Sequence, residues 1–161
     1  MCIVKGLKGV SGDIEICLTP EAAEDLEDTV GGFVVPFEEG RLIMCKHLRR
    51  NAWEFPGGRR EPGETPEACI RREAQEEAGI LLKNLRPLGY YTMEHAGRIK
   101  KASIYTAEVD GYAKRPDWSE MGEVALFESL PDDLSYRDGV YEAVLMHMGI
   151  CMREEGVERR E

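Results

Sequence analysis

The chain has 161 residues, a formal net charge of −10, and 42% hydrophobic and 32% charged residues. This length suits one domain with its own core, and the composition is typical of a soluble globular protein. The negative charge argues against a protein that binds duplex nucleic acid by neutralising its phosphates. No apolar run is long enough to span a membrane, and the first residues lack the pattern of a signal peptide. We therefore expect a cytoplasmic protein.

No internal repeat and no linker interrupts the chain, so we expect a single domain over residues 1–150. Residues 151–161 have little to bury and are predicted to form a frayed C-terminal tail. The cysteines are odd in number, scattered and without CxxC spacing, which favours free thiols in a reducing compartment over disulfides or zinc. They are Cys2, Cys17, Cys45, Cys69 and Cys151.

The first third of the chain favours strands. Alternating apolar residues predict a half-buried strand over 12–18. Residues 20–28 are acidic and fit either a turn of helix or a surface loop. Two apolar, β-prone runs at 29–37 and 41–47, joined by Glu38-Glu39-Gly40, predict a hairpin. Residues 53–56 predict a short strand that ends at a proline, and a glycine loop follows.

A helix is predicted over residues 66–78. Thr65 is a good N-cap, Pro66 occupies the first helical position, and Gly79 supplies the C-terminal stop. Ile70, Ala74 and Ala78 form an apolar stripe that can dock the helix on a core.

Three carboxylates share one face of this helix, because Glu73, Glu76 and Glu77 stand at i, i+3 and i+4. Like charges at this spacing repel each other, and a divalent cation would reverse that repulsion. Carboxylate oxygens suit Mg²⁺ or Mn²⁺. Arg72 lies beside the set, where it could pair with Glu64. The alternative interpretation is a solvated acidic face.

The second half of the chain predicts strands over 85–95 and 99–110, joined by a turn at 96–98. A loop follows at 115–122, then a last strand at 124–128 and a second helix over 138–148. Strands on both sides of a central helix, followed by a closing helix, predict a mixed sheet packed between helices.

The stretch 57–80 carries a long fixed pattern. The pattern begins at Gly58, and Glu64 follows after a spacer of five residues. After a second spacer of seven residues come Arg-Glu-apolar-any-Glu-Glu-any-Gly-apolar, from Arg72 to Ile80. Every fixed position is met without an insertion, and by this pattern the chain resembles the Nudix hydrolases. The resemblance implies an α/β (α+β) fold, a Nudix-type α/β/α sandwich with a mixed β-sheet.

The resemblance also implies metal-dependent hydrolysis of a pyrophosphate linkage. Glu73, Glu76 and Glu77 match the metal-ligand positions of the family, and Gly58 matches the position that offers a backbone carbonyl near the metal. Glu64 and Arg72 match the pair that braces the site. The general base varies in position across the family. It is either one of the box glutamates or a later one, with Glu120 and Glu123 as candidates, unless these are simply solvated loop residues.

Two groups outside the pattern are candidates for substrate binding. Lys46, His47, Arg49 and Arg50 form a basic cluster that either contacts phosphates or is an exposed loop. Phe33, Val35, Tyr91 and Trp118 are candidate walls of a base or sugar pocket, although aromatic and apolar residues at such positions are more often core.

Residues 53–58 (WEFPGG) together with residues 122–135 resemble the MutT-type nucleoside triphosphate pyrophosphohydrolases, one of which acts on oxidised guanine nucleotides. The sequence markers of ADP-ribose, dinucleoside polyphosphate, coenzyme A and NADH enzymes are missing. The resemblance implies cleavage of an NTP or dNTP to NMP and pyrophosphate, with 8-oxo-dGTP sanitation as a candidate role.

Three alternatives stay open: an RNA 5′-pyrophosphohydrolase, an ADP-ribose or nucleotide-sugar hydrolase, and a non-catalytic nucleotide-sensing module of the Nudix fold. We expect a small-molecule nucleotide substrate, no stable nucleic-acid partner, no membrane partner, and a monomer or homodimer.

Overall fold

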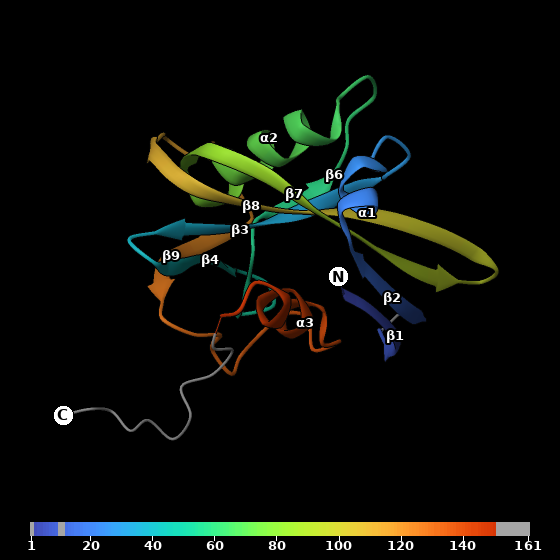
Figure 1. The fold of residues 1–161 in the computed structure, drawn as a ribbon. Helices are drawn as coiled ribbons and strands as arrows, with labels where there is room; N and C mark the ends of the chain where they lie inside the picture. The colour runs from blue at the N-terminus through green and yellow to red at the C-terminus, as the bar shows by residue number, and fades with distance from the viewer. Residues whose placement is uncertain (1, 10–11, 151–161) are drawn as a thin grey trace.

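A nine-stranded sheet forms the middle of the molecule, with helix α2 on one face and helix α3 on the other (Figure 1). This computed structural model describes residues 2–9 and 12–150. The arrangement confirms the predicted mixed sheet between helices. The predicted frayed tail at 151–161 lies outside the described residues.

The strands and helices follow one another along the chain in the order β1, β2, α1, β3 to β6, α2, β7 to β9 and α3. The strands are β1 Cys2–Lys8, β2 Asp13–Leu18, β3 Gly31–Glu38, β4 Arg41–His47, β5 Ala52–Glu54, β6 Gly57–Arg59, β7 Ile80–His95, β8 Arg98–Tyr112 and β9 Met121–Phe127. The helices are α1 Pro20–Glu24, α2 Pro66–Ala78 and α3 Val140–His147. The predicted hairpins and helices are therefore confirmed, while β1 and β6 were not predicted.

The sheet has the order β1-β2-β7-β8-β3-β4-β5, with β6 paired to β3 and β9 paired to β4. The β3–β8 pair is parallel and the other strand pairs are antiparallel, which makes the sheet mixed. In the β3–β4 hairpin only two residue pairs are in register, next to the turn. The two strands then diverge, which leaves room for β6 beside β3 and for β5 beside β4, while β9 pairs with the opposite edge of β4.

Strand β6 occupies the stretch that the sequence indicated as a glycine loop. It pairs with the start of β3, Gly31 opposite Arg59 and Phe33 opposite Gly57. A Cβ atom on Gly31 would lie 2.3 Å from the carbonyl oxygen of Gly58, so side chains are excluded from this contact. The loop prediction was wrong because glycines usually weaken strands, whereas here they permit a close backbone approach.

Each face of the sheet carries its own hydrophobic cluster. Ile70, Ala74 and Ala78 of α2 are buried on one face, as predicted for the apolar stripe of that helix. Tyr141 and Val144 of α3 are buried on the other face. Among the described residues, Cys17, Cys45 and Cys69 are free thiols. No described helix is long and apolar enough to cross a membrane.

Candidate active site

Helix α2 is held in position by local caps at both ends. The Thr65 hydroxyl accepts a hydrogen bond from the Ala68 N–H at 3.1 Å. Gly79 adopts a left-handed conformation with φ 64° and donates to the Gln75 carbonyl at 3.0 Å. These contacts confirm the predicted caps and fix the two ends of the helix. Burial of Ile70, Ala74 and Ala78 against the sheet sets its rotation, which aims the carboxylates at strand β6.

The glycines of β6 let the backbone touch these carboxylates. The Gly57 N–H donates to Oε1 of Glu77 at 2.7 Å. A Cβ atom at Gly58 would lie 2.4 Å from Oε1 of Glu73, well inside van der Waals contact. Any larger residue at position 58 would therefore displace the Glu73 carboxylate.

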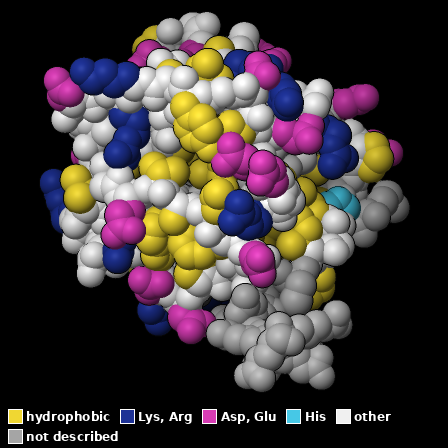
Figure 2. Space-filling model, turned by 90° about the vertical axis from the view of Figure 1, so that its left-hand side faces the viewer, with side chains coloured by type: hydrophobic (Ala, Val, Ile, Leu, Met, Phe, Trp, Pro, Cys, Tyr) yellow, Lys and Arg dark blue, Asp and Glu magenta, His cyan; other side chains and the backbone are white. Residues whose placement is uncertain are grey.

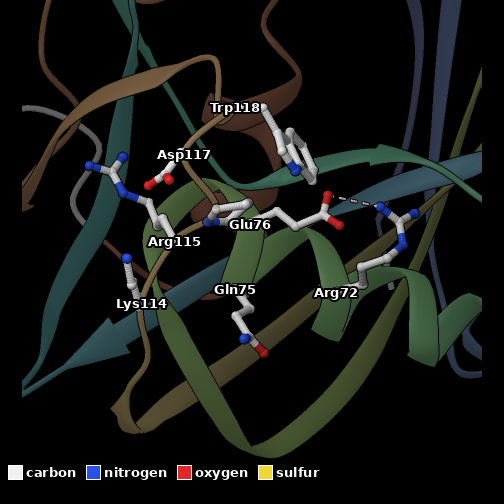
Figure 3. A pocket seen from close by; sticks show the side chains of 8 residues that line it. Arg72, Gln75, Glu76, Lys114, Arg115, Asp117 and Trp118 are labelled. Carbon is white, nitrogen blue, oxygen red and sulfur yellow. Dashed lines mark hydrogen bonds and ion pairs between the residues drawn. The ribbon is translucent and has the colours of Figure 1, made fainter.

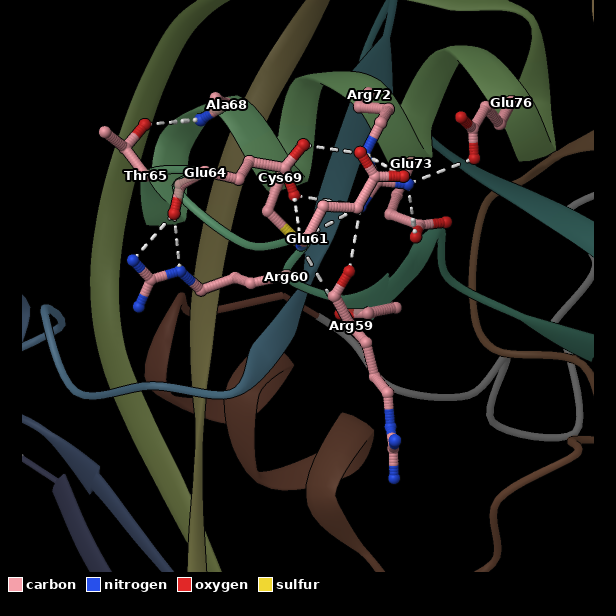
Figure 4. A network of polar contacts seen from close by, with 11 residues as sticks. Arg59, Arg60, Glu61, Glu64, Thr65, Ala68, Cys69, Arg72, Glu73 and Glu76 are labelled. Carbon is pink, nitrogen blue, oxygen red and sulfur yellow. Dashed lines mark hydrogen bonds and ion pairs between the residues drawn. The ribbon is translucent and has the colours of Figure 1, made fainter.

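Arg72 lies at the centre of a polar network that joins the loop, the helix and β6 (Figure 4). Its guanidinium donates to both carboxylate oxygens of Glu64, at 2.7 and 2.9 Å. It also donates to Glu73 Oε1 at 2.9 Å, to Glu76 Oε2 at 3.1 Å and to the Arg59 carbonyl at 2.8 Å. The predicted pairing of Arg72 with Glu64 is confirmed, and Arg72 also orients two of the predicted metal ligands.

Glu64 is itself fixed from a second side. The Glu61 N–H donates to Glu64 Oε1 at 3.0 Å, and Arg60 donates to the Glu64 carbonyl oxygen at 2.7 and 2.9 Å. The hydrogen bonds from Arg72 hold the pKa of the Glu64 carboxyl at about 2. Glu64 is therefore ionised at neutral pH and anchors the guanidinium.

Burial raises the pKa values of two helix carboxylates, whereas the pKa of Glu64 is lowered. It raises the pKa of Glu77 to about 8, and nearby Glu73, Glu54 and Glu76 add to the effect. Burial also raises the pKa of Glu73, against the lowering effect of Arg72. Arg72 and the Gly57 N–H compensate the charged forms of these carboxylates only in part, and a bound cation would supply the rest.

The chemistry of this donor set fits a hard divalent cation. Nudix proteins generally require a divalent metal ion. The hydrogen bonds described above use one oxygen each of Glu73, Glu76 and Glu77, which leaves the second oxygen of each as a candidate ligand. In the part of the chain that the structure describes, no three His, Cys, Asp or Glu side chains are already grouped closely enough to hold a metal ion.

A cavity of about 420 Å³ lies beside β6. Phe33 and Tyr91 line it, as predicted, together with Phe55 and Tyr141. The Phe33 and Tyr141 rings meet edge to face at 5.1 Å, and the Tyr141 hydroxyl accepts from the Phe55 N–H at 3.1 Å. Val35 is fully buried in the core and does not line this cavity. Five aromatic side chains line this cavity, which we call the aromatic cavity, together with charged and small residues. Gly57 and Gly58 in its lining connect it to the carboxylates of α2.

Trp118 lies in a different cavity, of about 550 Å³, which α2 and the loop between β8 and β9 form (Figure 3). The prediction that Phe33 and Trp118 line one pocket was therefore wrong. Sequence position could not reveal on which side of α2 the loop would place the indole.

The remaining predicted residues line neither cavity. Lys46 lies over the Trp53 ring, with Nζ 5.6 Å from its centroid, and Arg49 is exposed. Glu120 is exposed and pairs with the buried His47, Nε2 to Oε2 3.5 Å. The other candidate base, Glu123, is exposed on β9.

Sequence reasoning missed Glu54, a buried carboxylate that lines the aromatic cavity. Arg50 donates to it at 2.9 Å, and the same guanidinium lies 5.3 Å from the Tyr136 ring centroid. Residues 133–135 pair with Trp53, which brings Tyr136 to this position. The location of Glu54 inside the WEFPGG motif was the available signal.

Several known proteins resemble this chain. A NUDIX domain profile matches residues 25–139. YtkD of Bacillus subtilis, whose proposed activity is that of an 8-oxo-dGTP diphosphatase, is 35% identical over 96 residues, which are 60% of this chain and 60% of YtkD. The RNA pyrophosphohydrolase of Hydrogenovibrio crunogenus is 38% identical over 58 residues, 36% of this chain and 35% of that protein. This chain thus spans at most about three fifths of the length of these curated relatives.

Solved structures agree with the fold. The Bacillus subtilis pyrophosphohydrolase BsRppH superposes with a TM-score of 0.69 at 26% identity, over 82% of this chain and 80% of that one. A MutT Nudix hydrolase from Burkholderia pseudomallei superposes with a TM-score of 0.59 at 24% identity, over 72% of this chain and 95% of that one. The predicted MutT-type resemblance is confirmed by these comparisons. The uninterrupted glycine, carboxylate and arginine pattern, its arrangement on α2 and β6, and the profile match over most of the chain together establish that this protein belongs to the Nudix family.

Proposed function

We propose that this protein is a divalent-metal-dependent hydrolase that cleaves the pyrophosphate linkage of a nucleoside triphosphate, giving a nucleoside monophosphate and pyrophosphate. The observation that carries the proposal is the contact of the α2 carboxylates with Gly57 and Gly58, which also line the aromatic cavity. A nucleoside in that cavity would present its phosphates to the carboxylates.

The proposed ion is Mg²⁺ or Mn²⁺, held by Glu73, Glu76, Glu77 and the Gly58 carbonyl. When bound, it would polarise phosphoryl oxygens and offset the charge that develops on them. Arg72 keeps Glu73 and Glu76 in reach of the site, and the Gly57 N–H orients Glu77.

Glu120 is the proposed general base, which would take a proton from the attacking water. His47 supports this role because its Nδ1 accepts from the Arg50 N–H at 3.2 Å, so that its Nε2 faces Glu120. Lys46 and Arg49 are proposed phosphate contacts on the same β4–β5 side, where each would offset charge on the polyphosphate. Because neither residue lines the aromatic cavity, we propose the terminal phosphates as their targets.

Two relatives suggest which substrate occupies the site. The relation to YtkD favours a guanine nucleotide, with 8-oxo-dGTP as the proposed physiological substrate. The relation to RNA pyrophosphohydrolases and the superposition on BsRppH favour a second candidate, a triphosphorylated RNA 5′ end. The chemistry at phosphorus is the same in both cases, so the two candidates differ only in what the cavities bind.

Release of pyrophosphate and phosphate in the presence of Mg²⁺ tests the proposal. The substrates are the common NTPs and dNTPs, 8-oxo-dGTP, ADP-ribose and a 5′-triphosphorylated RNA, with Glu77→Gln as the control. Metal-dependent release of monophosphate and pyrophosphate from a triphosphate, lost in the variant, is expected. Hydrolysis of ADP-ribose or RNA alone would refute the proposed substrate. No hydrolysis of any of these substrates would favour a nucleotide-sensing module.

A cytoplasmic location and a monomeric or homodimeric state also stay predictions.

A further inference from the structure

Glu54 is the only acidic residue in the described part of the chain that is buried, with 5% of its surface exposed. The other described acidic residues are partly or fully exposed, and Figure 2 shows those of one face among basic side chains. Burial of a charged carboxylate costs free energy unless hydrogen bonds or opposite charges compensate it. Glu54 therefore needs partners.

Arg50 compensates only one oxygen of this carboxylate. Its Nη1 atom donates to Glu54 Oε2 at 2.9 Å, and no hydrogen bond from a described residue reaches Oε1. Each carboxylate oxygen can accept two hydrogen bonds, so Oε2 also keeps accepting capacity. Because Glu54 lines the aromatic cavity, both oxygens are available to a donor on a molecule bound there.

A hydroxyl donor lies next to the carboxylate. The same Nη1 atom of Arg50 donates to the Tyr136 hydroxyl oxygen at 3.2 Å, so one guanidinium nitrogen holds Tyr136 and Glu54 side by side in the lining. Burial raises the pKa of Tyr136 and the charge of Glu54 adds to the effect, so the hydroxyl keeps its proton at neutral pH. The wall of the cavity thus presents one donor followed by two acceptors, which we call the polar row.

The polar row is complementary to one edge of guanine. That edge carries the O6 acceptor, the N1–H donor and the N2 amino donor, whereas the same edge of adenine carries the N6 amino donor and the N1 acceptor. A carboxylate accepts two parallel N–H bonds well, as it does from arginine. Opposite adenine it would face the N1 lone pair. Aromatic walls stack on every base, so discrimination between bases falls to the polar row.

We propose that Glu54 and Tyr136 determine the base specificity of the aromatic cavity. Glu54 accepts the N1–H and N2 amino donors of guanine, Tyr136 donates to O6, and Arg50 is a positioning residue that holds both side chains. This inference rests on the proposed function, in which the aromatic cavity binds the base of the substrate. Oxidation at C8 changes the opposite edge of the ring, so the polar row selects guanine over adenine but does not distinguish guanine from 8-oxoguanine.

Calorimetric titration of the unmodified protein with deoxynucleoside monophosphates tests the polar row. These ligands have no pyrophosphate linkage and cannot be hydrolysed, and no metal ion is added. The ligands are dGMP, dIMP, which lacks the N2 amino group, and dAMP. We expect dIMP to bind about 10- to 100-fold more weakly than dGMP, the usual cost of one lost hydrogen bond to a charged group. The loss for dAMP should be larger still, because its N1 atom cannot donate to Glu54.

Variants assign the preference to individual side chains. Glu54→Gln replaces one acceptor by an amide donor, so dGMP and dAMP should bind with similar affinity, while the ratio between 8-oxo-dGMP and dGMP should stay as in the unmodified protein. Tyr136→Phe should weaken dGMP and dIMP alike, because both carry O6. Glu67→Gln is the control: Glu67, like Glu54, pairs with an arginine four residues away but lies outside the lining, and all affinities should stay unchanged.

Several results would overturn the inference. In the unmodified protein these are equal affinities for dGMP and dIMP, equal affinities for dGMP and dAMP, or no binding of dGMP; none of them depends on whether a variant folds. A guanine preference that persists in Glu54→Gln would assign the preference to other residues. Equal weakening of all ligands in that variant would make Glu54 a structural partner of Arg50 only.

Hydrolysis of triphosphates by the unmodified protein is measured separately, so that the two proposals can fail independently. A guanine preference that Glu54→Gln removes, without hydrolysis of any triphosphate, would refute the proposed function and leave the role of Glu54 standing. Hydrolysis together with equal affinities for dGMP and dAMP would refute the role of Glu54 and leave the proposed function standing.

Discussion

Replacement of Glu64 by glutamine should destabilise the fold measurably, although Glu64 is not among the proposed metal ligands. The variant keeps the shape of the side chain but loses the charge that faces Arg72. The pKa of Glu64 falls from its usual 4.5 to about 2, which corresponds to roughly 3 kcal/mol at about 1.4 kcal/mol per pKa unit. Both partners of the pair touch solvent, since the side chains of Arg72 and Glu64 are 21% and 12% exposed. Screening by water therefore reduces the expected loss to about 1–2 kcal/mol at pH 7.

The pH dependence follows from the sign of this shift. Because the folded pKa lies below the usual value, the stabilisation is fully present above pH 4.5 and is lost as the pH falls toward 2. Urea unfolding of both proteins between pH 7 and pH 2.5 measures the free energy of unfolding. The difference in the free energy of unfolding between wild type and Glu64→Gln should become steadily smaller below pH 4.5.

Glu67→Gln, in the first turn of α2, is the matched control. Glu67 pairs with Arg71 at 3.0 Å, but its side chain is 58% exposed. Its loss should cost no more than about 0.5 kcal/mol. Two results would refute the argument that the pair with Arg72 is the source of the stabilisation. One is an equal loss of unfolding free energy in both variants at pH 7. The other is a loss in Glu64→Gln that stays constant down to pH 2.5.

Three further predictions concern the site itself. Glu77→Gln should abolish metal-dependent hydrolysis without lowering the metal-free free energy of unfolding at pH 7, because burial raises the Glu77 pKa to about 8 and already favours a neutral side chain; a destabilised variant would contradict this. Tyr141→Phe leaves the buried Phe55 N–H without its acceptor, so urea unfolding should show a loss of about 1–3 kcal/mol, and unchanged stability would show that another acceptor replaces the hydroxyl. Gly58→Ala should reduce Mg²⁺ affinity and turnover, because its Cβ would lie 2.4 Å from a carboxylate oxygen of α2. The control is Gly111→Ala, which should have little effect on either quantity, because the nearest atom lies 3.9 Å from the new Cβ.

The sequence alone determined helix α2 and the family. Thr65 and Gly79 cap the helix through groups only three or four residues away, so the signal for its ends is contained in a short window. The spacing of Glu73, Glu76 and Glu77 places them on one face of any regular helix. These features depend on local geometry, and each was predicted correctly before any tertiary contact was known.

Only the tertiary structure decided what surrounds those carboxylates. The Arg50 guanidinium meets Tyr136 86 residues later in the chain, and the Phe55 N–H meets Tyr141 at the same separation. Strand β6 exists because glycines on β3 and β6 allow two backbones to approach within a distance that no Cβ would permit. The side of α2 on which Trp118 lies depends on how the β8–β9 loop attaches to the helix end. Contacts of this range arise when the sheet assembles, and no local pattern in the sequence encodes them.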